Sequence, residues 1–165
     1  GDLSIQHLND PARRRIHLEA KRLNSSYEDL VFFIPALAQQ TDPDLSKLRY
    51  IRFQGSLLAL QDDFSAKGNW QTGLGDLQTA LRIKLYPRRS PAYQGSLKLS
   101  GFDAGAIWGL PSLGKIDFEG SLQGQGGSLR DAEAVYSGTI QSLRFNEYTY
   151  HNIGVEGSLK EQLFL

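Results

Sequence analysis

The sequence of 165 residues contains no cysteine. This absence excludes disulfide bonds, thiolate catalysis and zinc sites with cysteine ligands, and it leaves an oxidising compartment such as the periplasm open. Net charge is absent too, because 18 lysine and arginine residues balance 18 aspartate and glutamate residues. A neutral chain has no overall field that would attract it to nucleic acid or to an anionic membrane surface. We therefore expect no nucleic-acid partner.

Long apolar runs are also missing from the sequence. The longest candidate, Leu30–Ala38, contains Pro35 and falls far short of the roughly 20 apolar residues that a membrane helix needs. Gly1 is not a natural translation start, and the apolar run Leu163–Leu165 stops without a turn. We expect the chain to be an internal piece of a longer protein. Cut ends would expose strand edges, which leaves a crystal dimer or a strand swap as an open alternative.

What the sequence does contain is a repeated pattern in which a glycine sits between apolar residues at every second position. Residues between these positions, such as Gln54, Gln94 and Glu119, are polar. A period of two with one apolar face predicts half-buried strands. The six copies are Ile51-x-Phe53-x-Gly55-x-Leu57, Phe64-x-Ala66-x-Gly68-x-Trp70, Tyr93-x-Gly95-x-Leu97, Ile116-x-Phe118-x-Gly120-x-Leu122, Ala134-x-Tyr136-x-Gly138-x-Ile140 and Ile153-x-Val155-x-Gly157-x-Leu159.

The spacing of these glycines predicts the topology. Successive glycines are 13, 27, 25, 18 and 19 residues apart, and the last two spacings fit one long strand plus a turn. We therefore predict an antiparallel meander, with turns at Asn146-Glu147 and Gly124–Gly127. Because every copy places its glycine on the apolar face, neighbouring strands could align the glycines into a stripe without side chains. Two interpretations stay open: the glycines allow a sharp bend of the sheet, or they make room for a long apolar ligand.

Two segments interrupt the strand pattern. Ser25 and Glu28 form a capping-box pattern before a short helix expected at about 26–36, and Asp103 and Pro111 enclose a second one at about 102–110. We expect both to close an open end of the sheet. The predicted fold is mainly β, a curved antiparallel meander that forms a U-shaped, taco-like groove or a flattened open barrel. Residues 1–165 form one unit, with a first strand and short helix in 1–47 and the glycine-register repeats in 48–165.

Residues with catalytic or metal-binding chemistry are scattered. The histidines His7, His17 and His151 show no metal-ligand spacing, and the Gly73–Gly75 stretch lies in a turn. The aspartates in 41–44 and 61–63 are typical of turns. The basic clusters 13–15 and 87–91 are interpreted as solvated turns, with contact to an anionic headgroup as the alternative. We expect no catalytic residue, no metal and no cofactor, and predict that the chain is not an enzyme.

Three stretches carry a family resemblance: 93–105, 110–122 and 142–160. They resemble the repeating segment of the AsmA-like and TamB-type translocation and assembly module proteins of Gram-negative bacteria, in particular a Bacteroidetes-like branch. Leu30–Ala36 is similar to the short helical insertion of that family. The sequence departs from the family where Glu147 replaces the glycine of an Asn-Gly turn, which questions how tight that hairpin is.

The resemblance implies a large periplasmic protein that is anchored in the inner membrane and reaches the outer one. Its apolar trough would carry phospholipid, or another acyl-chain ligand, between membranes or assist the assembly of an outer-membrane barrel protein. The alternatives are a structural or adhesive β-repeat module with a closed core, and an envelope glycosidase, which would need two carboxylates facing each other. The residues expected to line the groove are Ile51, Phe53, Leu57, Phe64, Trp70, Tyr93, Leu97, Ile116, Phe118, Leu122, Tyr136, Ile140, Ile153, Val155 and Leu159.

Overall fold

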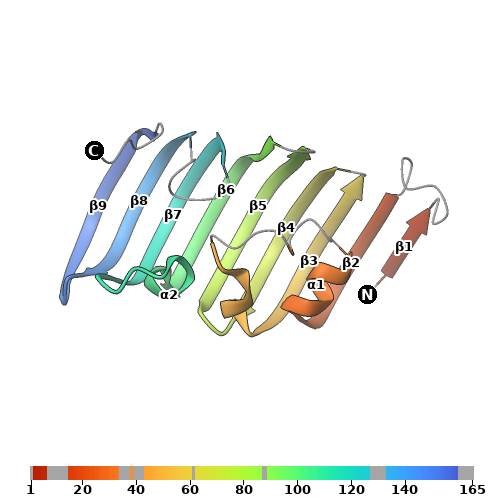
Figure 1. Ribbon diagram of the computed structural model, residues 1–165, viewed down its shortest axis with the longest axis horizontal. Coiled ribbons are helices and arrows are strands. Elements are labelled where there is room, and N and C mark those ends of the chain that lie inside the picture. The colour runs from red at the N-terminus through yellow and green to blue at the C-terminus, as the bar shows by residue number, and fades with distance from the viewer. Residues whose placement is uncertain are drawn as a thin grey trace.

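The computed structural model describes residues 2–6, 15–33, 38, 43–60, 62–86, 89–126 and 133–159. Within these residues, nine strands form one antiparallel sheet in sequence order, with β1 and β9 at opposite ends (Figure 1). The strands are β1 (Asp2–Gln6), β2 (Arg15–Ser26), β3 (Tyr50–Leu60), β4 (Asp63–Thr72), β5 (Gly75–Tyr86), β6 (Arg89–Asp103), β7 (Leu113–Gln125), β8 (Glu133–Phe145) and β9 (Tyr148–Leu159). The predicted mainly β meander, open and not closed into a barrel, is confirmed. The sheet is continuous between the two predicted segments, 1–47 and 48–165, because β2 of the first pairs with β3 of the second.

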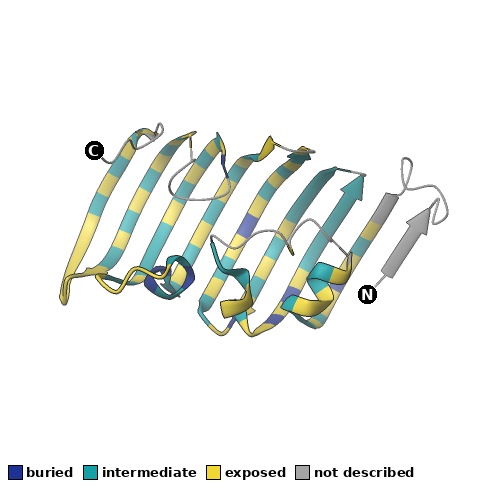
Figure 2. Ribbon diagram, viewed as in Figure 1, coloured by how far each residue is buried: buried dark blue, intermediate teal, exposed yellow. Residues whose placement is uncertain are grey.

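The alternating sequence pattern produces the two faces of this sheet. In β6, Leu97 and Leu99 are half-buried, whereas Ser96 and Lys98 between them are exposed. Successive side chains of a strand point to opposite faces, and the banding of the strands in Figure 2 follows this rule. We call the face that carries Leu97 the inner face and the face that carries Lys98 the outer face.

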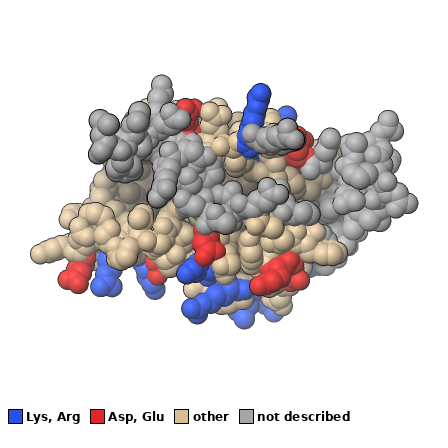
Figure 3. Space-filling model, viewed as in Figure 1, with Lys and Arg blue, Asp and Glu red and all other residues tan. Residues whose placement is uncertain are grey.

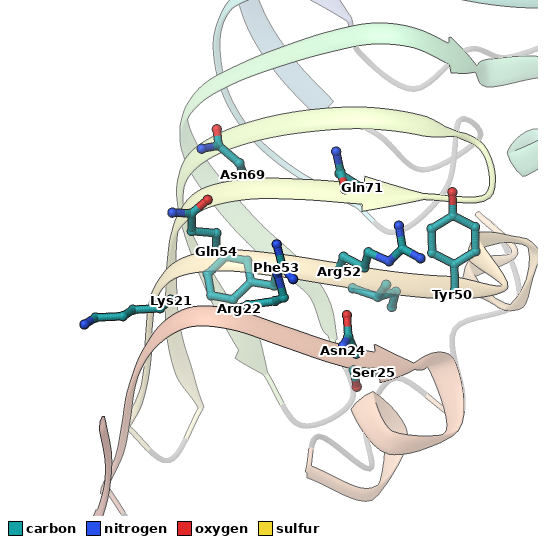
Figure 4. Close-up of a pocket in the computed structure, with 11 residues that line it drawn as sticks. Lys21, Arg22, Asn24, Ser25, Tyr50, Arg52, Phe53, Gln54, Asn69 and Gln71 are labelled. Carbon is teal, nitrogen blue, oxygen red and sulfur yellow. The ribbon is translucent and has the colours of Figure 1, made fainter. Parts of the chain in front are cut away.

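The strands bend sharply near their middle. Figure 4 shows the bend in the strands beside Gln54 and Asn69. Their neighbours Gly55 and Gly68 lie directly opposite each other on β3 and β4. Register shifts, such as the one between Ala20 and Leu23 on β2, add local twist. The sheet is therefore curved, as the glycine-rich strands predicted.

Two short helices interrupt the meander. Helix α1 (Tyr27–Phe33) lies within the segment expected to be helical, and residues 34–36 of that segment lie outside the described residues. The predicted capping box was wrong by one residue. The Ser26 backbone N–H donates to the Asp29 carboxylate at 3.0 Å, and the Asp29 N–H donates to Ser26 Oγ at 3.3 Å. Ser25 and Glu28 do not form the reciprocal pair because Ser25 is still in strand β2.

Helix α2 (Ala104–Trp108) confirms the second prediction, although it is shorter than 102–110. The Asp103 carboxylate accepts a hydrogen bond from the Ala106 backbone N–H at 2.9 Å, and Gly109 ends the helix in the left-handed conformation. Phe102 belongs to β6, where it pairs with Ile116. A 3-10 helix, η2 (Leu45–Leu48), follows α1. In Figure 1 both helices and η2 lie along the same ends of the strands.

The hairpin between β8 and β9 is as tight as a hairpin can be. Asn146 and Glu147 form its two-residue turn, with φ of 47° and 69°, and Phe145 pairs directly with Tyr148. Positive φ at both positions is the geometry of a type I′ turn. Glu147 therefore adopts the conformation that favours glycine. At the other predicted turn, Gly124 and Gln125 continue β7, and residues 127–132 lie outside the described part of the chain.

Candidate functional site

The inner face brings the predicted lining residues together. Three rows of residues cross the strands on this face, as the pairing register shows. The aromatic row is Leu23, Phe53, Trp70, Leu77, Leu99, Phe118, Ile140 and Ile153; the glycine row is Ala20, Gly55, Gly68, Thr79, Leu97, Gly120, Gly138 and Val155; the leucine row is Leu18, Leu57, Ala66, Leu81, Gly95, Leu122, Tyr136 and Gly157.

The remaining predicted residues extend the same face at both ends of the strands. Phe64 and Tyr93 lie beyond the leucine row, where Leu159 of β9 pairs with Ala134. Ile51 and Ile116 lie beyond the aromatic row. Every predicted lining residue thus takes a register position on the inner face. This face is continuous from β2 to β9 among the described residues.

The glycines do not form a single stripe. Gly55 faces Gly68, and Gly120 faces Gly138, but Thr79 and Leu97 stand between these pairs in the glycine row. Gly95 and Gly157 lie in the leucine row instead. The sequence could not reveal this division because it depends on the register of each hairpin.

Aromatic rings already occupy the space above several of these glycines. A Cβ atom added to Gly68 would lie 2.7 Å from the Phe53 ring, and one added to Gly120 or Gly138 would lie 2.7 or 2.9 Å from the Phe118 ring. At such distances the rings rest directly on the glycine backbone. The space that the glycines create is therefore filled by the protein itself in this conformation.

Backbone geometry supports the bend at two further positions. Gly55 has φ of 151° and Gly95 has φ of 139°, and a Cβ atom there would lie 2.2 Å from Lys67 O or 2.0 Å from Ala80 O. These φ values suit glycine alone, and the neighbouring strand approaches too closely for any side chain. Of the two interpretations of the glycine pattern, the geometry supports the sharp bend.

Burial divides the inner face into two regions. The helix end comprises the aromatic row and the residues between it and the helices, and the open end comprises the leucine row and the residues beyond it. At the helix end, Ile51 is 2% and Phe53 1% exposed, and Phe102, Ala104 and Ile107 are also buried, whereas the rest of the aromatic row is half-buried. At the open end, every side chain that the structure describes is half-buried and none is fully buried. Ile51 and Phe53 are thus core residues, whereas Leu57 and Leu122 remain accessible.

Polar contacts on the inner face fix the ring of Trp70. The Trp70 ring centroid lies 4.2 Å from that of Phe53, and its Nε1–H donates to Thr79 Oγ1 at 2.8 Å. The Thr79 hydroxyl donates in turn to the Ala66 carbonyl at 3.3 Å. A buried indole N–H needs such a partner. Thr79, which the sequence pattern did not single out, therefore orients the largest side chain of the groove.

Charged groups make structural contacts. The carboxylate of Asp63 forms an ion pair with Arg82, whose hydrogen bond lowers the aspartate pKa. Asp117 accepts hydrogen bonds from the Ser142 hydroxyl and from the Gly101 backbone N–H, which lower its pKa. Because Gly101 and Ser142 lie where β6 and β8 shift register, Asp117 joins two irregular strands. The Asp44 carboxylate accepts from Ser46 N at 3.1 Å and begins η2, as expected of a turn aspartate.

The described residues contain no group of three histidine, aspartate or glutamate side chains that could hold a metal ion. His17 contacts Glu19 at 3.2 Å, His151 is exposed, and His7 lies outside the described residues. Residues 13, 14, 87 and 88 of the two basic clusters also lie outside the described residues. In the view of Figure 3, acidic and basic side chains intermingle along the lower edge of the molecule. No helix in the described part of the chain has the length and apolarity to cross a membrane.

Sequence reasoning missed one strand of the groove. Strand β5 places Leu77, Leu81 and Ile83 on the inner face, between the second and third glycine copies. It carries Thr79 where β3, β4, β7 and β8 carry glycine, so the glycine pattern did not mark it. The strict alternation from Leu77 to Leu85 was a signal that could have found it. The 27-residue spacing between Gly68 and Gly95 is thus explained by the additional strand β5, which lies between them.

Comparison of the chain with models of protein families, with curated proteins and with solved structures finds no match.

Proposed function

We propose that the chain is a non-enzymatic segment of a periplasmic envelope protein, anchored in the inner membrane, whose inner face carries phospholipid acyl chains between membranes. The observation that carries the proposal is the open end of the inner face, where continuous apolar rows stay half-buried across the described strands. A conduit needs apolar area without strong polar contacts, because burying each methylene group contributes about 0.8 kcal/mol and specific polar contacts would hold the cargo in place. Leu57, Leu122 and Tyr136 offer such a surface.

The test is site-specific photocrosslinking with a benzoyl-phenylalanine probe in the presence of phospholipid vesicles. A probe at Leu122, on the inner face, should crosslink to phospholipid. The same probe at Ser121, the next residue on the outer face, is the matched control and should not. Native mass spectrometry of the purified chain should show co-purifying phospholipid. Equal crosslinking at both positions, or none at Leu122 and no bound lipid, would refute the proposal.

The same proposal includes assistance to an outer-membrane barrel protein during assembly. In the described part of the chain, β9 pairs with β8 alone, and its other edge can pair with an added strand. Such an edge augments an incoming strand. A urea-unfolded outer-membrane barrel protein should crosslink to a probe at Thr149 on β9 more than to one at Thr139 on β8. Equal yields would remove this second activity and leave the lipid proposal unaffected.

One observation favours a second candidate, a structural or adhesive module with a closed core. Ile51 and Phe53 are fully buried, and Phe53 stacks on Trp70. If the whole face closed in the same way in solution, water would not reach Leu122. Hydroxyl-radical footprinting distinguishes the two candidates, because the closed core predicts protection of Leu57 and Leu122 equal to that of Phe53. The conduit predicts strong labelling of the two leucines.

A further inference from the structure

The outer face of β2, β3 and β4 carries a polar hollow of about 900 Å³ (Figure 4). It lies on the opposite side of the sheet from the apolar groove, since its exposed side chains alternate with the buried Ile51 and Phe53. The residues that line it are Lys21, Arg22, Asn24, Ser25, Tyr50, Arg52, Gln54, Asn69 and Gln71, together with Ile51 and Phe53 of β3.

Cross-strand register builds the hollow from three strands. Asn24, Arg52 and Gln71 are direct neighbours across β2, β3 and β4. Gln54 and Asn69 form the next pair toward the bend. Lys21 and Arg22 lie at the register shift of β2. There, two residues of β2 stand opposite the single residue Gln54 of β3. The bulge thus adds a second cation to one end of the hollow.

Cations without a carboxylate surround this hollow. Two described cations elsewhere on the outer face do have acidic partners, Arg82 with Asp63 and Lys98 with Glu119 at 2.8 Å. Lys21, Arg22 and Arg52 have no ion-pair partner among the described residues, and the lining contains no carboxylate. In a chain of zero net charge, three unmatched cations around one cavity are a local excess that favours an anion.

The remaining side chains supply neutral hydrogen-bonding groups. The Arg52 guanidinium lies over the Tyr50 ring, 5.3 Å from its centroid, which limits its movement. Asn69 accepts a hydrogen bond from Gln78 at 3.1 Å, which leaves its amide N–H₂ to donate into the hollow. Amides donate and accept at once and so match hydroxyl groups, whereas a planar guanidinium matches phosphate oxygens.

We propose that this hollow is a binding site for a phosphorylated saccharide. Arg52 and Arg22 would contact the phosphate, and Asn24, Gln54, Asn69 and Gln71 the sugar hydroxyls. The hollow has room for a sugar ring beside the phosphate, since its volume of about 900 Å³ lies within the range of small-molecule sites. The site does not depend on the function proposed for the inner face.

Calorimetric titration of the whole chain at low ionic strength tests the site with three probes: glucose 1-phosphate, glucose and inorganic phosphate. Glucose 1-phosphate should bind at least about tenfold more tightly than either of the others, since only it uses both sets of groups. No heat of binding at millimolar concentrations would overturn the proposal. Equal affinity for phosphate and glucose 1-phosphate would overturn the saccharide assignment.

Matched variants locate the binding. Arg52→Ala should weaken glucose 1-phosphate binding about tenfold, and Gln71→Ala should weaken it less. Lys98→Ala removes an outer-face cation away from the hollow and should leave affinity unchanged. Circular dichroism checks that each variant is folded, and Arg52→Lys, which keeps the charge but loses the planar fork, serves if Arg52→Ala does not fold. Equal losses in Lys98→Ala and Arg52→Ala would indicate non-specific charge attraction and refute the site.

Vesicles provide the last comparison. If the three cations serve a lipid surface instead, the chain will sediment with phosphatidylglycerol vesicles, Arg52→Ala will abolish this sedimentation, and glucose 1-phosphate will not compete with it. That result would refute the saccharide proposal. Sedimentation that is absent, or abolished by glucose 1-phosphate, supports it.

Discussion

The helix end and the open end of the inner face are built by the same strands with the same alternation, yet they differ in burial. At the helix end Phe53 is 1% exposed, whereas Leu57, four residues further along β3 on the same face, is half-buried. Alternation decides which face a side chain occupies. What covers that face decides whether the side chain becomes core. The helices and η2 lie along one set of strand ends in Figure 1, so the dry core forms there.

The largest expected effect comes from shortening a side chain at the helix end, compared with the same kind of change at the open end. Phe53→Ala should lower the free energy of unfolding by about 3–5 kcal/mol, because it leaves a cavity in a fully buried cluster. Leu122→Ala at the open end should cost about 1 kcal/mol, since the half-buried leucine loses less apolar contact. Urea denaturation measures both. Equal losses would show that the two ends are packed alike, and the distinction between them would fail.

A second pair of variants tests the bend that lies between the two regions. Gly55→Ala should destabilise the chain by about 2–3 kcal/mol, since its φ is positive and the Lys67 carbonyl blocks a Cβ atom. Gly154→Ala is the control, because nothing lies within 4 Å of its added Cβ. It should change stability by less than about 0.5 kcal/mol. Thermal unfolding of both variants gives the answer, and a neutral Gly55→Ala would contradict the role of this glycine in the bend.

Thr79→Val sharpens the boundary between the regions. Loss of the hydroxyl leaves the Trp70 indole N–H without its acceptor, which should cost about 1–2 kcal/mol. Thr139→Val makes the same change at an exposed outer-face position of β8 and should be neutral within about 0.5 kcal/mol. Chemical denaturation compares the two. A neutral Thr79→Val would mean that the hydrogen bond does not hold Trp70 in place.

The smallest effect concerns pH and the carboxylate of Asp117 on β7. Hydrogen bonds from Ser142 and Gly101 lower the pKa of Asp117 in the folded chain, so folding favours its charged form. Its contribution, about 1 kcal/mol, is therefore complete above the unfolded pKa near 3.9 and is lost as pH falls through the lower folded value. Asp117→Asn should reduce stability at neutral pH and flatten its decline in acid. Asp76→Asn, at an exposed position, serves as the control. Identical acid profiles for wild type and Asp117→Asn would refute this linkage.

Local pattern was sufficient to predict most of this architecture, but not its register-dependent details. Asp103 predicted the start of α2, and Asn146 with Glu147 predicted the position of the turn between β8 and β9 although not its tightness, because each depends on neighbouring residues alone. The capping box was misplaced by one residue because β2 continues through Ser26 before the chain turns into α1. The polar hollow could not be predicted, since Arg22, Arg52 and Gln71 meet only through the bulge and the pairing of three strands.

The meander topology allows the sheet to be lengthened. Each strand pairs with its sequence neighbours alone, so a hairpin can be added at the β9 edge without changing any existing pair. Neighbouring strands lie about 4.8 Å apart, so every inserted hairpin would extend the trough by about 10 Å. Contacts that stay local also allow folding to proceed from one hairpin to the next while the chain emerges. Such a fold can be lengthened by duplication of hairpins alone, with no change in the strands already present.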